Sequence, residues 1–196
     1  MFHVFPRAVP KKECERLLDY CIKNTNFSEA SVLNNGDSDA SANYGRVDPR
    51  IRKTDIAFVT PDGNEDNIVN KVAWHYLREA NKIQFNYKLE YFQPVQFARY
   101  RNGGHYGWHQ DSSGASASGE ARKLSLTFSL SDPKTYEGGH LEFYRGERPM
   151  DEQVIEDIRG QGSVIVFDSR DYHRVTPVTK GTRYSIVCWT VGPNFR

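Results

Sequence analysis

Apolar residues recur with helical spacing in two parts of the N-terminal half. The first set predicts a helix from Pro10 to about Asn24. Its members stand at i, i+3, i+4, i+7 and i+8: Cys14, Leu17, Leu18, Cys21 and Ile22. The second set predicts a helix from near Asn64 to about Lys82: Ile68, Val69, Val72, Ala73, Tyr76, Leu77 and Ala80. His75 lies off this second stripe and is expected to be exposed.

Apolar runs bounded by turn residues predict strands in the remainder of the chain. Phe2 to Phe5 is expected to form a short edge strand, and Asp55 to Thr60 a strand that ends at a Pro-Asp-Gly turn. After Pro94 six further strands are predicted: 95–101, 123–131, 140–145, 162–168, 171–176 and 183–191. Two supporting helices followed by a run of strands predict an α+β domain built on a β-sandwich or barrel.

Two stretches carry few apolar residues. Residues 28–45 are rich in Ser, Ala, Asn, Asp and Gly, which predicts a mobile loop. Gly45 to Lys53 carries four basic residues, and we interpret it as a solvated connector. The alternative is a basic rim that steers an acidic partner. The four residues are Arg46, Arg50, Arg52 and Lys53.

The composition narrows the class of protein. With 196 residues, 38% of them hydrophobic and 13% aromatic, the chain is expected to form one domain with a real core. We expect residues 1–93 to give helical support and strands, and residues 94–193 to give the catalytic core. A net charge of +1 argues against bulk attraction to nucleic acid or membranes. Three scattered cysteines give no disulfide framework, and the N-terminus has no signal-peptide pattern, so a cytoplasmic protein is expected.

Candidate chemistry centres on His109-Gln110-Asp111. In extended chain, positions i and i+2 point to the same side, so the imidazole and the carboxylate can face one point. His173, 62 residues after Asp111, can supply a third ligand from a neighbouring strand. Two histidines and one carboxylate with open coordination positions are typical of non-haem Fe(II) oxygenases.

Arg183 adds a second element to this site. It stands in an apolar stretch that predicts a buried strand, where an unpaired charge is costly. Its planar fork suits a carboxylate held by two hydrogen bonds. A dicarboxylate such as 2-oxoglutarate, bound to the metal at one end and to Arg183 at the other, would supply the partner. The alternative is a carboxylate of the protein itself.

An ordered set of motifs over about residues 95–191 resembles the Fe(II)/2-oxoglutarate-dependent dioxygenases, in their prolyl 4-hydroxylase-like branch. The set comprises Tyr100, Gly103-Gly104, Tyr106, His109-x-Asp111, Glu137-Gly138-Gly139, Gly162-Ser163, His173 and Arg183-Tyr184-Ser185. The resemblance implies a double-stranded β-helix, or jelly roll, with iron at its open mouth. It also implies that 2-oxoglutarate and O₂ are converted to succinate and CO₂ while a C–H bond is hydroxylated.

The resemblance also implies individual roles. His109, Asp111 and His173 would hold Fe(II), and Arg183 would anchor 2-oxoglutarate with contributions from three further residues: Tyr100, Thr127 and Ser185. Substrate would meet Arg122, Trp189 and Tyr106, and ascorbate would be a further cofactor. The expected substrate is a prolyl or related residue of a protein, which rests on family analogy alone.

Three alternatives stay open on the residues alone. The chain could oxygenate a free small molecule or an alkylated nucleobase, although its near-neutral charge counts against nucleic acid. It could be a non-enzymatic jelly-roll binding or sensor module. A degraded ligand set would have indicated such a module, but His109, Asp111, His173 and Arg183 are all present. A zinc hydrolase shares the ligand types, but Arg183 and the lack of an evident general-base glutamate argue against it. The oligomeric state is left open.

Overall fold

The fold is organised around a nine-stranded antiparallel sheet. The computed structural model describes residues 1–31, 47–59, 68–146, 150 and 152–195. Across the sheet the strands run in the order β1 (Phe2–Phe5), β11 (Val164–Asp168), β8 (Glu120–Ser129), β13 (Val178–Pro193), β6 (Val95–Arg101), β4 (Asp55–Val59) and β2 (Ser28–Glu29). Two short strands, β5 (Tyr91–Phe92) and β9 (Tyr136–Gly138), pair with β13. The long strand β13 therefore links most of the sheet.

A second antiparallel sheet faces the first. Its four strands run in the order β10 (Leu141–Phe143), β12 (His173–Val175), β7 (His105–His109) and β3 (Arg52–Lys53). Buried residues from both sheets meet in one apolar cluster, including Tyr100 and Phe167 from the larger sheet and Phe143 and Val175 from the smaller. The interior between the sheets is therefore filled by side chains.

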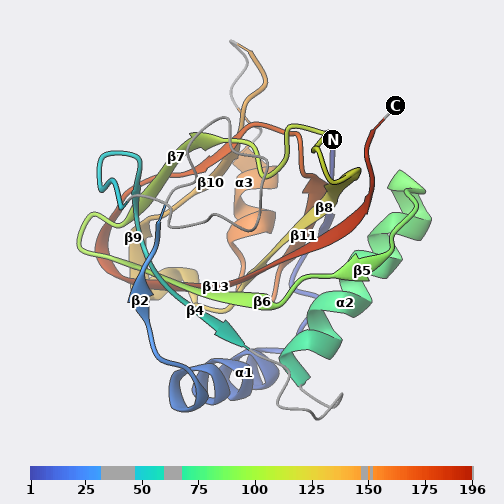
Figure 1. Ribbon diagram of the computed structural model, residues 1–196. Coiled ribbons are helices and arrows are strands. Elements are labelled where there is room, and N and C mark those ends of the chain that lie inside the picture. The colour runs from blue at the N-terminus through green and yellow to red at the C-terminus, as the bar shows by residue number, and fades with distance from the viewer. Residues whose placement is uncertain (32–46, 60–67, 147–149, 151, 196) are drawn as a thin grey trace.

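Two helices cover the outer face of the larger sheet (Figure 1). They are α1 (Lys11–Asn24) and α2 (Ile68–Ala80), and α2 continues into a π-helical turn, η1 (Asn81–Phe85). Leu17 of α1 and Leu77 of α2 are fully buried in one cluster with Phe97 and Phe128 of the sheet. Burying each such side chain contributes about 1.5–3 kcal/mol, so this layer is a major source of stability.

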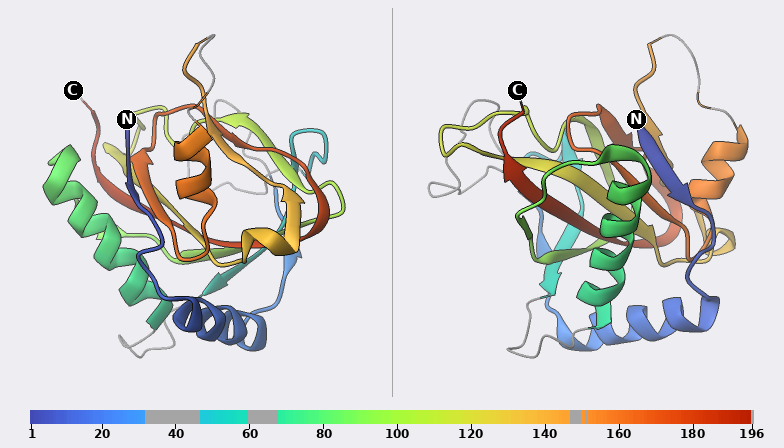
Figure 2. Two further views of the ribbon diagram at one scale, coloured as in Figure 1. Left: turned by 180° about the vertical axis from the view of Figure 1, so that it is seen from behind. Right: turned by 90° about the vertical axis from the view of Figure 1, so that its right-hand side faces the viewer.

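A third helix, α3 (Glu152–Arg159), lies apart from α1 and α2 and stands in the middle of the view from behind (Figure 2). A 3-10 turn, η2 (Pro133–Thr135), precedes β9. Ile158 of α3 is buried in the inter-sheet cluster, and its carbonyl accepts a 3.0 Å hydrogen bond from Ser129 Oγ of β8. The helix therefore closes one end of the space between the sheets.

Most of the predicted elements are confirmed. The edge strand β1, helix α1 and strand β6 have the expected positions, and His75 is exposed. The second helix is described from Ile68, and its predicted start, like Thr60, lies outside the described residues. The same holds for residues 32–45 of the predicted loop and for Arg46. No helix in the described part of the chain has the length and apolarity needed to cross a membrane.

Two expectations were wrong, and several elements were not predicted. Ile22 is 48% exposed, because α1 turns only one narrow stripe toward the sheet. Arg52 is buried in β3 and its guanidinium lies 4.5 Å from the centroid of the Tyr106 ring, so it is not part of a solvated connector. Helix α3 and strand β7 were not predicted at all. Both are short elements whose positions depend on the packing of the sheets around them.

Candidate metal centre

His109, Asp111 and His173 converge at one end of the space between the sheets. His109 is the last residue of β7 and pairs directly with His173, the first residue of β12. Asp111 follows β7, and its backbone N–H donates a 2.9 Å hydrogen bond to the carbonyl of Ser169. One potential ligand atom from each of the three residues lies within 4.8 Å of the other two. This is the only such group of three in the described part of the chain.

Both imidazoles turn the same nitrogen toward the carboxylate. Nδ1 of His109 lies 2.8 Å from the carbonyl oxygen of Gly107, and Nδ1 of His173 lies 2.9 Å from that of Asp171. A carbonyl can only accept, so Nδ1 of each ring carries the proton and Nε2 keeps a free lone pair. Each Nε2 lies 3.6 Å from an oxygen of Asp111. The fixed tautomers are those that metal ligation requires.

The charge states also fit a divalent cation. Burial lowers the pKa of His173 to about 4, so the ring is neutral at physiological pH. Burial alone would raise the pKa of Asp111, but the two histidines and Arg122 together hold that pKa below its usual range. Each imidazole Nε2 lies 3.6 Å from the carboxylate, so His109, Asp111 and His173 would together hold one divalent cation. Two neutral nitrogens and one carboxylate on one side leave the opposite positions open.

Two buried serines hold the carboxylate in place. Ser125 Oγ of β8 donates a 2.7 Å hydrogen bond to Oδ2 of Asp111, and it lies 2.9 Å from Ser169 Oγ. Ser125 was not among the site residues expected from the sequence. The contact joins residues of different strands, and no local pattern in the sequence marks it.

Arg183 lies deep in the space between the sheets. It is 3% exposed, its Nη1 donates to Ser185 Oγ at 3.3 Å, and its guanidinium lies 5.3 Å from the Tyr100 ring centroid. Among the described residues, none of the carboxylates lies within 4.0 Å of Arg183. The alternative of a pairing within the described protein is therefore not seen.

The absence of a side chain at Gly139 leaves space for the side chain of Arg183. Its φ is +65°, and a Cβ atom there would lie 2.8 Å from Val178 Cγ2 and 3.0 Å from Arg183 Cδ. Both the backbone conformation and the close approach therefore favour glycine at this position. Thr127 lies between Ser125 and Ser129 on the inward face of β8, opposite Val187.

The predicted substrate residues lie near Asp111 but contact each other. The guanidinium of Arg122 lies 4.0 Å from the centroid of the Trp189 ring, and its Nε donates a 2.8 Å hydrogen bond to Gln93 Oε1. Trp189 is buried, with 8% of its surface exposed, and its ring is covered by Arg122. Tyr106 stacks on His109, with ring centroids 3.5 Å apart. These contacts surround the candidate metal centre with cationic and aromatic groups.

A family model matches residues 95–191, and its description is the 2OG-Fe(II) oxygenase superfamily. The matched span runs from β6 through both histidines and Asp111 to the end of the Arg183 strand. The chain belongs to the 2OG-Fe(II) oxygenase superfamily. Fe(II) and 2-oxoglutarate are the groups that this name implies, and the donor set of the candidate metal centre fits the first.

Curated relatives of this superfamily member are named PKHD-type hydroxylases. One from Acidovorax ebreus (strain TPSY) is 37% identical over 135 residues, which are 65% of this chain and 56% of that protein. One from Idiomarina loihiensis is 31% identical over 145 residues, covering 68% of this chain and 60% of that protein. The chain spans only about half the length of the curated relatives it matches.

Solved structures show the same fold at low identity. A viral collagen prolyl hydroxylase from Paramecium Bursaria Chlorella virus-1, in its 2OG complex, has a TM-score of 0.66 and 19% identity over 97% of this chain and 96% of that one. A prolyl hydroxylase from Trichoplax adhaerens, bound to a hypoxia inducible factor peptide fragment, has a TM-score of 0.69 and 19% identity over 96% and 82%. The predicted double-stranded β-helix with supporting helices is confirmed.

Proposed function

We propose that this chain is an Fe(II)- and 2-oxoglutarate-dependent dioxygenase that hydroxylates a C–H bond in a prolyl or related residue of a protein. The observation that carries the proposal is the convergence of His109, Asp111 and His173 in one structure with a buried Arg183 that has no carboxylate partner among the described residues. The first group suits a metal with open positions, and the second suits the far end of a dicarboxylate.

Each residue of the site has a proposed role. His109, Asp111 and His173 would hold Fe(II), which supplies the activation of O₂ when bound. Arg183, supported by Ser185 and Tyr100, would bind the distal carboxylate of 2-oxoglutarate. Ser125 would keep the Asp111 carboxylate turned toward both histidines. Because Arg183 and His173 are buried between the two sheets, the cosubstrate would be held away from bulk water.

The substrate class rests on two supports. The relatives and neighbours named above include hydroxylases, and one prolyl hydroxylase is named with a bound peptide fragment. The second support is Arg122, which lies over Trp189 beside the metal centre and has donors suited to a backbone carbonyl. We propose that Arg122 orients a peptide substrate, with Trp189 holding its guanidinium in place.

The test is to supply the protein with Fe(II), 2-oxoglutarate and O₂, and to offer proline-containing peptides and free metabolites in parallel. Succinate release and the mass gain of one oxygen atom are followed together. The proposal expects both signals with a peptide. Oxygen incorporation into a free metabolite only would sink the peptidyl assignment, and no succinate under any condition would sink the oxygenase assignment.

A further inference from the structure

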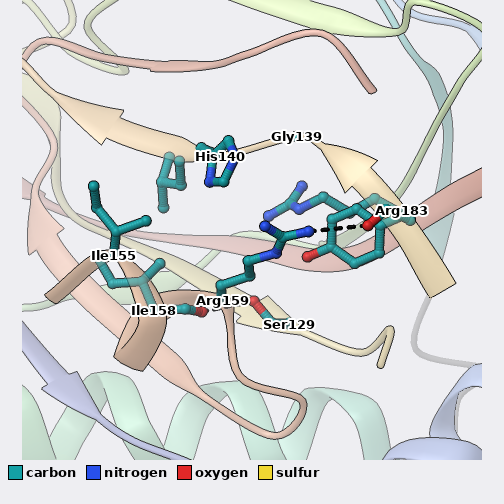
Figure 3. A pocket seen from close by; sticks show the side chains of 9 residues that line it. Ser129, Gly139, His140, Ile155, Ile158, Arg159 and Arg183 are labelled. Carbon is teal, nitrogen blue, oxygen red and sulfur yellow. Dashed lines mark hydrogen bonds between the residues drawn. The ribbon is translucent and has the colours of Figure 1, made fainter. Parts of the chain in front are cut away.

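A small basic cavity lies behind Arg183, where α3 meets the sheets (Figure 3). Its volume is about 10 Å³, which is room for about one water-sized group. Polar side chains of Ser129, His140, Arg159 and Arg183 line it, together with Ile155 and Ile158 of α3. Arg159 is the last residue of α3, so the helix missed by sequence reasoning delivers a second guanidinium to this point.

The cavity has cations but no anion. Its lining contains no carboxylate, and among the described residues neither Arg159 nor Arg183 has one within 4.0 Å. Nε of Arg159 and Nδ1 of His140 are buried without a hydrogen-bond partner. A buried donor without a hydrogen-bond partner destabilises the protein, and more so when the donor is charged. The cavity is therefore built for a ligand that brings acceptor oxygens and negative charge.

Part of the Arg159 guanidinium already has partners within the protein. Its Nη2 donates to the carbonyl oxygen of Tyr136 at 2.9 Å, and its guanidinium lies 4.9 Å from the Tyr136 ring centroid. Burial is the main cause that lowers the pKa of His140, and the positive charge of Arg159 is the second. Glu142 and Glu156 act in the opposite direction, but Glu142 is paired with Arg174 at 2.7 Å and Glu156 is exposed. The positive field at the cavity therefore stays uncompensated.

The distance to the metal centre suits a bridging dicarboxylate. Ser129 lines the cavity, whereas Ser125 on the same face of β8 bonds the metal-facing Asp111. Four residues of extended strand span about 13 Å. A five-carbon dicarboxylate would bridge most of that span. It would bind the metal at one end and accept hydrogen bonds of about 2.8 Å at the other, because the arginine side chains reach toward the distal carboxylate.

We propose that Arg159 is a second anchor for the distal carboxylate of 2-oxoglutarate, acting with Arg183 as a two-arginine clamp. This inference rests on the proposed function of the site. One guanidinium can donate hydrogen bonds to two lone pairs of a carboxylate. The second guanidinium can donate to the lone pairs on the other edge of the same carboxylate. The clamp makes the site selective, because a 2-oxo acid with a methyl end would bury both charges without a partner.

The test compares two ligands that differ only at the distal end. The protein is loaded with Mn²⁺, which takes oxygen and nitrogen ligands, and kept free of O₂. 2-Oxoglutarate and 2-oxopentanoate, which has a methyl group in place of the distal carboxylate, are titrated by calorimetry. Arg159→Gln is expected to weaken 2-oxoglutarate binding about tenfold or more and to leave 2-oxopentanoate binding unchanged.

Arg78→Gln is the matched control. Arg78 also stands in the last turn of a helix, α2, and its guanidinium lies 4.6 Å from the centroid of the Phe92 ring, but it is exposed and lines no described cavity. It should bind both ligands as the wild type does. Should Arg159→Gln fail to fold, Arg159→Lys keeps the charge but loses the planar fork, and it should lose affinity for 2-oxoglutarate alone.

Each other outcome overturns a defined statement. If wild type prefers 2-oxoglutarate and the Arg159 variant binds it equally well, the second anchor is wrong and the proposed function stands. If the variant loses affinity for both ligands equally, Arg159 only stabilises the turn at Tyr136, and the anchor is again wrong. If wild type itself does not prefer 2-oxoglutarate over 2-oxopentanoate, both proposals are wrong.

Discussion

Oγ of Ser125 donates a 2.7 Å hydrogen bond to Oδ2 of Asp111, the one carboxylate that faces both His109 and His173. Ser125 is fully buried on β8, whereas Asp111 follows β7 in the opposite sheet. The hydrogen bond therefore ties the two sheets together at the metal centre. It also leaves Oδ1 of Asp111 without that constraint and turned toward His109.

Removing this hydrogen bond should weaken metal binding. In Ser125→Ala the carboxylate rotates more freely, and losing such an outer partner typically costs about 10–100-fold in metal affinity. Metal titration of the purified variant measures the loss directly. Ser163→Ala is the control, because Ser163 is equally buried and accepts a 3.0 Å hydrogen bond from the Arg7 backbone far from the metal centre. Equal affinities in the two variants would contradict a positioning role for Ser125.

Sequence patterns predicted the three residues of the candidate metal centre, which the structure brings together, but not the residues around them. His109, Asp111 and His173 follow from residue type and strand parity, and β6 follows from its apolar run. The Ser125 contact could not be predicted, because it depends on how β8 lies against the end of β7. Helix α3 was missed because its eight residues carry a short apolar stripe among charged ones, and its stability comes from packing. Arg159 was missed with it.

The burial of charged residues was also difficult to predict from the sequence. A run of basic residues indicates a solvated surface, yet Arg52 is buried against Tyr106. Arg183 was correctly expected to be buried because apolar residues flank it on a long strand. Arg52 stands between Ile51 and Lys53 in a run of basic residues, and its burial depends on the pairing of β3 with β7. Only tertiary structure distinguishes the two arginines.

Replacement of a metal-facing residue should abolish turnover. His109→Ala and His173→Ala each remove one of three ligands, and Asp111→Glu displaces the carboxylate by one methylene at a site that tolerates about 0.5 Å of error. Iron content and succinate production are measured for each variant. Retention of both iron and turnover in the alanine variants would contradict the assignment of the metal centre.

Arg183→Ala should raise the KM for 2-oxoglutarate at least about tenfold, because a charge-assisted contact worth about 1.5–3 kcal/mol is lost. Metal affinity should change little, since Arg183 lies on β13 of the larger sheet, whereas His109 and His173 lie on β7 and β12 of the smaller sheet. Titration of Fe(II) and of 2-oxoglutarate into wild type and variant separates the two effects. An unchanged KM would mean that the distal carboxylate binds elsewhere.

Arg122→Ala should slow hydroxylation of substrate and leave the uncoupled conversion of 2-oxoglutarate nearly intact. The uncoupled reaction needs only the metal, the cosubstrate and O₂, whereas Arg122 is proposed to orient the peptide. Succinate release with and without substrate is compared in both proteins. Arg78→Ala serves again as a control, because its cation–aromatic contact with Phe92 resembles that of Arg122 with Trp189. Equal loss in the two reactions would argue for a structural role.

The last prediction separates backbone strain from crowding at Gly139. Gly139→Ala and Gly119→Ala both place an alanine at positive φ, +65° and +82°, which costs about 1–2 kcal/mol in each. Only at Gly139 does the new Cβ approach other atoms, at 2.8 Å from Val178 Cγ2 and 3.0 Å from Arg183 Cδ, whereas nothing lies within 4 Å at Gly119.

Crowding typically adds about 1–3 kcal/mol, so Gly139→Ala should lower the free energy of unfolding more than Gly119→Ala does. It should also weaken 2-oxoglutarate binding, because relief of the 3.0 Å contact displaces the Arg183 side chain. Denaturant unfolding and cosubstrate titration measure the two effects. If both variants lose the same stability and bind 2-oxoglutarate equally, Gly139 serves the turn alone and does not make room for Arg183.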